Sequence, residues 1–150
     1  MPKQKKRKER SRPRAPESRR VEELIVRYKL EPTLNDVYVE GPADARLIDW
    51  FLSENDLEDV AVYDISTVHL PAETLLERGL PDNNKGRVIA LAEMLEPHIS
   101  QRTGQTTCVV DQDLDIVLEK TREHELLVLT DYTCLEMYSY DVDSLNKFLR

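Results

Sequence analysis

The sequence has few cysteines and no long apolar run. Cys108 and Cys134 are the only cysteines in 150 residues, and they do not form a CxxC pair. This argues against a disulfide framework and a thiolate zinc site, and it fits the reducing cytoplasm. The three histidines are scattered, so nothing groups them as metal ligands. No apolar stretch is long enough to span a membrane, and the N-terminus lacks the apolar core of a secretory signal.

Charge is distributed unevenly along the chain. Residues 1–20 carry ten Lys or Arg against two acids, a net charge of +8, whereas the remainder carries 11 basic against 27 acidic residues, a net charge of −16. A basic arm on an acidic body is typical of a nucleic-acid-binding tail; the alternative is a solvated tail without a specific ligand. Residues 1–18 lack apolar periodicity and contain three prolines. We therefore expect a disordered tail followed by one domain over residues 19–150.

Apolar patterns over the rest of the chain predict strands that alternate with helices. This order favours an α/β sandwich with a mostly parallel sheet of about four strands and helices on both faces. The last helix, capped by Asp143 or Ser144, has no C-terminal stop signal, so we expect either a finished domain or, preferably, the N-terminal part of a longer protein. The strands are predicted at 36–40, 60–65, 106–110 and 126–129, and the earlier helices at about 19–29, 42–53, 72–78 and 85–96.

Acidic residues directly follow two of the predicted strands. Glu40 follows the first in VYVEGPAD, and Asp111 and Asp113 follow the third in VVDQDLD. In open α/β folds, ligands bind at the carboxyl edge of the sheet, where these acids are expected. Clustered carboxylates repel one another unless a cation neutralises them, and Mg²⁺ prefers oxygen ligands. The alternative is that these acids sit at strand ends and face water.

Four segments also occur in a recognisable order, and together they resemble a TOPRIM domain, the topoisomerase–primase module. The chain is most similar to TOPRIM-like proteins of bacterial phage-defence loci, such as the nuclease component of PARIS systems, and more distantly to OLD-family nucleases. The matching segments are VYVEGPADARLIDWFL at 37–52, NKGRVIALAEML at 84–95, VVDQDLD at 109–115 and LVLTDYTCLEMY at 127–138.

The resemblance implies a metal-dependent nuclease in antiviral defence. Glu40 matches the TOPRIM glutamate, a metal ligand or general acid/base, and Asp111 and Asp113 match its Asp-x-Asp metal ligands. Mg²⁺ (or Mn²⁺) in such a site bridges phosphate oxygens and activates water. Hydrolysis of DNA or RNA is favoured over strand passage, because no separate tyrosine-bearing domain is present. The resemblance further implies an ATPase partner that restrains or activates the nuclease.

Several nearby residues have two interpretations. Asp115 is either a further metal ligand or an acid in a solvated loop. Glu136 is either a further metal ligand that lines the site or an exposed helix acid. Asp131 either lines the site or is exposed, like Glu136. Asp44 either caps the following helix, which we favour, or points at the site. Lys85, at a predicted helix start, either holds a phosphate together with the helix amides or is solvated, and we favour the solvated lysine.

Two other functions compete with a nuclease. The first is a non-catalytic TOPRIM-like module that binds nucleic acid or a partner, with the basic arm as its main contact. The second is another Mg²⁺-dependent phosphotransfer fold. Haloacid-dehalogenase phosphatases have their Asp-x-Asp near the start of the chain, and receiver domains have paired acids on the first strand. Neither order fits this sequence well.

Overall fold

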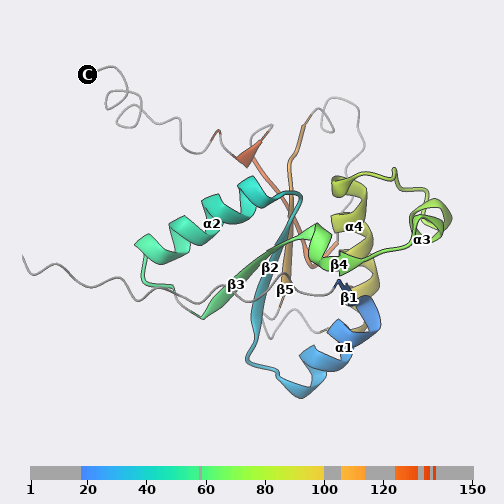
Figure 1. Cartoon of the computed structure of the whole chain (residues 1–150), viewed down its shortest axis with the longest axis horizontal. Coiled ribbons are helices and arrows are strands. Elements are labelled where there is room, and N and C mark those ends of the chain that lie inside the picture. Colours follow the sequence, from blue (N-terminus) through green and yellow to red (C-terminus); the bar gives the residue numbers. More distant parts are fainter. Residues whose placement is uncertain are drawn as a thin grey trace, which may run out of the picture.

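A four-stranded sheet organises the computed structural model, which describes residues 18–57, 59–99, 106–113, 124–131, 134, 135 and 137. The sheet has the order β3-β2-β5-β6, and each neighbouring pair is parallel (Figure 1). The expected α/β fold with a mostly parallel sheet of about four strands is therefore confirmed. The strands are β2 (Asn35–Val39), β3 (Val60–Asp64), β5 (Thr106–Val110) and β6 (Leu127–Leu129).

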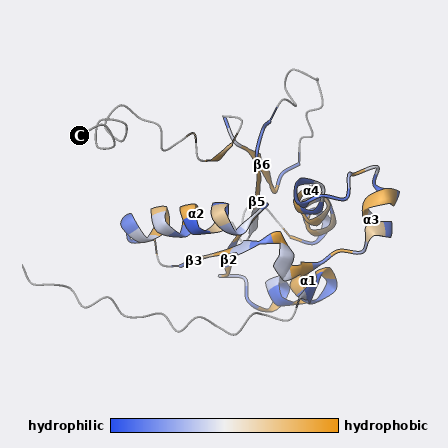
Figure 2. Cartoon of the chain, turned by 45° about the horizontal axis from the view of Figure 1, so that its top comes forward, coloured by the Kyte–Doolittle hydropathy of each residue, from blue (hydrophilic) through white to orange (hydrophobic). Residues whose placement is uncertain are grey.

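Helices lie on both faces of the sheet. Figure 2 shows α1 (Val21–Leu30) and α4 (Asn84–Leu95) on one face and α2 (Pro42–Glu54) on the other. The short helix α3 (Ala72–Glu77) packs against α4. Helix α4 is the most deeply buried, because apolar residues occur almost all around it. Its buried residues are Gly86, Val88, Ile89, Ala90, Leu91, Ala92 and Leu95.

The first helix begins later than predicted. We expected a helix from about residue 19, but Arg19–Arg20 form a short strand, β1, that pairs in parallel with β4 (Val68–His69). The guanidinium of Arg19 lies 5.2 Å from the centre of the Tyr63 ring, a cation–π geometry. The helix starts at Val21, the first residue of its buried stripe. The pairing with β4 and the contact of Arg19 with the Tyr63 ring thus hold Arg19 and Arg20 in an extended conformation, and the helix begins only after them.

A buried polar cluster lies at the amino end of the sheet. The Tyr28 hydroxyl donates to Asp36 Oδ2 at 2.9 Å and lies 2.9 Å from the Tyr38 hydroxyl, and Arg27 Nη1 lies 3.7 Å from the same Asp36 oxygen. Asp36 is 2% exposed. Burial raises the pKa of Asp36, while the Tyr28 hydrogen bond and the Arg27 charge act in the opposite direction. This cluster belongs to the core and lies away from the acids that follow the strands.

Some predictions fall outside the described residues. These are the tail up to residue 17, the acids Asp115 and Glu136, and the last helix that was expected to begin near Asp143. Among the helices that the structure does describe, none has both the length and the apolar character needed to cross a membrane.

Candidate functional site

The ends of β2 and β5 bring two of the predicted site residues together. Glu40 directly follows β2 and Asp111 directly follows β5, and the two strands are parallel neighbours. Oε1 of Glu40 accepts the backbone N–H of Asp111 at 2.9 Å. Parallel pairing explains this meeting, because it places the carboxyl ends of both strands at one edge although the residues are far apart in the chain.

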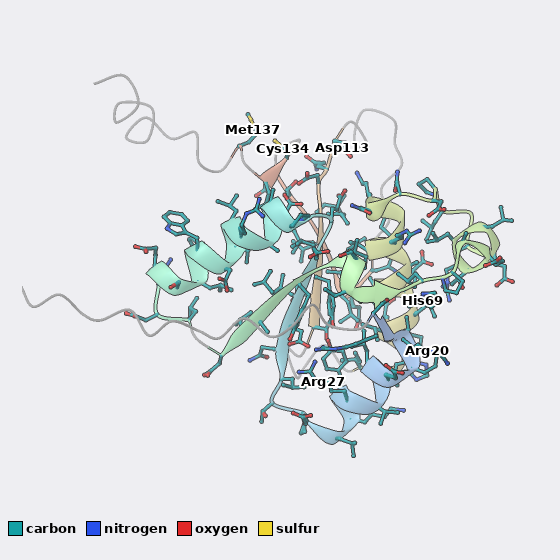
Figure 3. All side chains as sticks on the ribbon, viewed as in Figure 1. Arg20, Arg27, His69, Asp113, Cys134 and Met137 are labelled. Atoms are coloured by element: carbon teal, nitrogen blue, oxygen red, sulfur yellow. The ribbon has the colours of Figure 1, made fainter. Side chains whose placement is uncertain are left out.

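Lys85 lies between acids of this edge. Helix α4 begins here, and Lys85 Nζ donates to the backbone oxygen of Asp111 at 2.5 Å and to Asp113 Oδ2 at 2.8 Å. Figure 3 labels Asp113 on the loop that follows β5. The side chain of Lys85 is only 15% exposed, compared with 58% for Asp113. The interpretation of Lys85 as a solvated lysine is therefore wrong.

The surroundings of Glu40 raise the pKa of its carboxyl above the ordinary value. Burial raises the pKa of this carboxyl, and the negative charges of Asp111 and Asp113 raise it further. The hydrogen bond from the Asp111 N–H and the positive charge of Lys85 act in the opposite direction. A carboxyl whose pKa lies above its ordinary value is better matched to proton transfer near neutral pH.

Two neighbours of Lys85 fix the start of α4. The Asn83 side-chain oxygen accepts the Gly86 N–H at 2.8 Å, which caps the helix. A Cβ atom on Gly86 would lie 2.0 Å from the backbone oxygen of Pro81, so a larger residue requires the backbone to shift. The cap and this close approach together set the position from which Lys85 reaches the acids.

Thr130 is a positioning residue that the sequence analysis missed. It follows β6 and is 4% exposed, and its hydroxyl oxygen accepts the Gln112 N–H at 3.1 Å. Its own N–H donates to the Val110 oxygen at 3.1 Å. These bonds hold the loop in which Asp113 adopts a left-handed φ of +48°. The available signal was a polar residue directly after the apolar run LVL, at the same sheet edge as the acids.

The remaining candidates do not all converge on the site. Asp44 Oδ2 accepts the Gly41 N–H at 3.0 Å, so the favoured capping role of Asp44 is confirmed. Asp131, which follows Thr130, is exposed. Asp115 and Glu136 cannot be placed, since they lie outside the described residues.

The described side chains do not form a complete metal centre. Carboxylates such as Glu40, Asp111 and Asp113 provide the oxygen donors that Mg²⁺ prefers. Within the described part of the chain, however, no group of three or more His, Cys, Asp or Glu residues could hold a metal ion. One oxygen of Glu40 accepts a backbone N–H, and one of Asp113 is paired with Lys85. The positive charge observed among these acids comes from the lysine.

Comparison with known proteins adds no family assignment. Neither protein-family models, nor curated proteins, nor solved structures gave a match to this chain.

Proposed function

We propose that this sheet edge binds a nucleic-acid phosphodiester, and that the domain is a Mg²⁺-dependent, TOPRIM-like nuclease of antiviral defence. The observation that carries the proposal is the meeting of Glu40, Asp111, Asp113 and Lys85 where β2 and β5 end. The carboxyl edge is the usual ligand site of open α/β sheets. The resemblance of the four sequence segments supports the choice of reaction.

Each residue would have a distinct role in phosphodiester hydrolysis. Lys85, at the start of the 12-residue helix α4, would hold phosphate oxygens together with the N-terminal amides of that helix. Glu40 would accept a proton from the attacking water, a role that its raised pKa supports. Mg²⁺, when bound, would supply charge neutralisation at the phosphate. Asp111 and Asp113 are proposed metal ligands.

The proposed metal site needs more than the described residues. Asp115 and Glu136 remain the sequence-based candidates for the additional oxygen ligands. Because the described part of the chain contains no group of three or more His, Cys, Asp or Glu residues that could hold a metal ion, we treat the metal as part of the proposal. Its binding is therefore tested separately from cleavage.

Substitution of the acids tests the reaction. Glu40→Gln, Asp111→Asn and Asp113→Asn are each expected to abolish cleavage of DNA or RNA, and loss of a general base alone lowers a rate by about 10²–10⁴-fold. Asp59→Asn, in an exposed turn before β3, is the matched control and should keep full activity. Melting curves without metal should show folded variants, since removing one of several like charges relieves repulsion. Full activity of the Asp111→Asn protein would refute the assignment.

Metal titration of the melting curve tests the site without relying on activity. Mg²⁺ or Mn²⁺ should raise the melting temperature by binding the folded state, and Glu40→Gln and Asp111→Asn should reduce this rise. Asp59→Asn should not reduce it. Ionic strength is held constant, so that general screening of the acidic body does not differ between samples. Equal stabilisation of the natural protein and the three variants would mean that the metal neutralises the acidic body diffusely and does not bind at a specific site.

A non-catalytic binding module is the second candidate. It is favoured by one observation, namely the net charge of +8 on residues 1–20 ahead of an acidic body. In this case the basic arm would provide the nucleic-acid contacts, and the domain would contact a partner. Nucleic-acid binding without cleavage, combined with equal metal stabilisation of all four proteins, would select this function over the nuclease.

A further inference from the structure

A histidine just before β6 lies between two glutamates at the end of α4. His124 Nε2 lies 3.3 Å from Glu93 Oε1, and His124 Nδ1 lies 3.1 Å from Glu96 Oε2. Glu93 belongs to the last turn of α4, and Glu96 directly follows that helix. The other oxygen of Glu96 accepts the backbone N–H of Glu125 at 2.8 Å. These contacts join the segment that enters β6 to the most deeply buried helix of the fold.

The positions of both ring nitrogens determine which form of His124 fits these contacts. A carboxylate oxygen accepts hydrogen bonds but cannot donate them, and a neutral imidazole has one N–H and one nitrogen lone pair. In either neutral tautomer, therefore, one ring nitrogen directs its lone pair at a carboxylate oxygen. The imidazolium instead donates from both nitrogens and places a positive charge between two negative ones. The geometry thus favours contacts of the protonated ring.

The neighbouring charges are arranged in the same sense. Arg78, which directly follows α3, donates from Nη1 to the second oxygen of Glu93 at 3.0 Å, so that protonated His124 completes a set of two cations and two carboxylates. The Glu125 N–H, and then the hydrogen bond and charge of His124, lower the pKa of Glu96 below its ordinary value. Glu96 therefore remains ionised at the mildly acidic pH at which histidine gains a proton. Glu125 itself is exposed and adds a further negative charge beside His124 in the chain.

The contacts of His124 occur where β6 begins. This strand has three residues and, in the described part of the sheet, pairs with β5 alone. The Leu127 N–H donates to the His124 oxygen at 3.0 Å, and the Cys108 N–H of β5 donates to the Leu126 oxygen at 2.7 Å. His124 therefore anchors the residues at which the pairing with β5 starts. At its other end, β6 leads to Thr130, which holds the loop after β5.

We propose that His124 is a pH-dependent clamp between α4 and β6, in which protonation fastens the start of β6 to Glu93 and Glu96 and loss of the proton weakens this attachment. Because only the protonated ring donates to both carboxylates, the clamp stabilises the fold at mildly acidic pH. Its contribution declines as pH rises through the range in which histidine loses its proton, about pH 5 to 8. The contribution of Glu96 is complete above its ordinary pKa of 4.5 and is lost as pH falls through its lowered folded pKa. This proposal does not depend on the nuclease assignment.

Urea unfolding of the full chain at two pH values tests the clamp. His124→Gln removes the titrating ring, and the ratio of its unfolding equilibrium constant to that of the natural protein measures what the ring contributes. This ratio should be larger at about pH 5.5 than at about pH 8, by at least about threefold for two partly exposed ion pairs. His98→Gln is the matched control, because His98 is exposed and lies two residues after Glu96. Its ratio should change little with pH.

A second substitution separates the charge of the ring from its packing. His124→Lys keeps a positive charge throughout this pH range, so it should be more stable than His124→Gln at pH values near 8 and should depend less on pH than the natural protein. A ratio for His124→Gln that is the same at both pH values would overturn the proposal. An equal change for His98→Gln would also overturn it, since the effect would then come from the overall charge of the acidic body. If His124→Gln fails to fold, Glu93→Gln replaces it, because it removes the carboxylate opposite Nε2, and the same criteria apply.

Discussion

Replacing Lys85 by Met removes the positive charge that lies among the acids of the sheet edge in the described part of the chain. The methionine keeps most of the length of the side chain but cannot donate to the Asp111 oxygen or pair with Asp113. We expect the variant to be less stable than the natural protein in the absence of metal, because the remaining negative charges around Glu40 are then less compensated.

The size of the effect follows from the exposure of the two partners. Asp113 is 58% exposed, so solvent screens its pairing with Lys85, and such a pair contributes about 0.2–1 kcal/mol. The hydrogen bond from the ammonium to the Asp111 carbonyl is partly buried, and bonds that involve a charged group contribute about 1.5–3 kcal/mol. Together they predict a loss of about 2–4 kcal/mol, of which the carbonyl contact provides most.

Thermal and urea unfolding without metal would measure this loss. The matched control is Lys29→Met, which removes a lysine from an exposed position of α1 and should leave stability within about 0.5 kcal/mol of the natural protein. In an Asp113→Asn background, Lys85→Met should still be destabilising, since the contact with the Asp111 carbonyl remains to be lost. If Lys85→Met and Lys29→Met unfold at the same temperature, the inferred role of Lys85 in holding this edge is wrong.

Two further predictions concern the opposite end of the sheet and the arm. The folded carboxyl of Asp36 binds its proton more tightly than the unfolded one, whose ordinary pKa is 3.8, so its contribution to stability declines as pH rises from below this value through the raised folded pKa. Asp36→Asn should remove this decline. Urea unfolding of both proteins between about pH 4 and 7 should therefore show that the variant becomes more stable relative to the natural protein as pH rises. Parallel plots of unfolding free energy against pH would contradict the reasoning. Deleting residues 1–18 should weaken nucleic-acid binding and lower its salt dependence without changing cleavage-site choice, because arm contacts would be to phosphates; an unchanged salt slope in binding titrations would assign the arm another role.

Most of the main elements could be predicted because their apolar patterns are local. The pattern that predicted β5 gave residues 106–110, which the structure confirms, and that for α4 gave 85–96 against an observed 84–95. The strands β1 and β4 could not be predicted in this way. Each has two residues, which is too short for an alternating apolar pattern to be recognised. They form because two segments that are distant in the sequence pair with each other.

The candidate site was predictable only where topology determines it. Parallel neighbouring strands place Glu40 and Asp111 at one edge of the sheet independently of their side-chain contacts, so the predicted fold was sufficient to predict that the two residues are close together. The contacts of Lys85 depend instead on where α4 starts in three dimensions. The approach of Gly86 to the Pro81 carbonyl sets this start, and such a contact between backbones leaves no periodic signal in the sequence.

The charges at the edge also bear on the choice between a nuclease and a binding module. Three carboxylates, those of Glu40, Asp111 and Asp113, act against the single charge of Lys85, and residues 21–150 carry a net charge of −16. A phosphate that approaches this edge without a metal therefore meets net repulsion. Favourable phosphate binding here requires an added cation. Nucleic-acid binding that is unaffected by divalent metal must then come from the basic arm, and only metal-dependent binding can be attributed to the edge of the sheet.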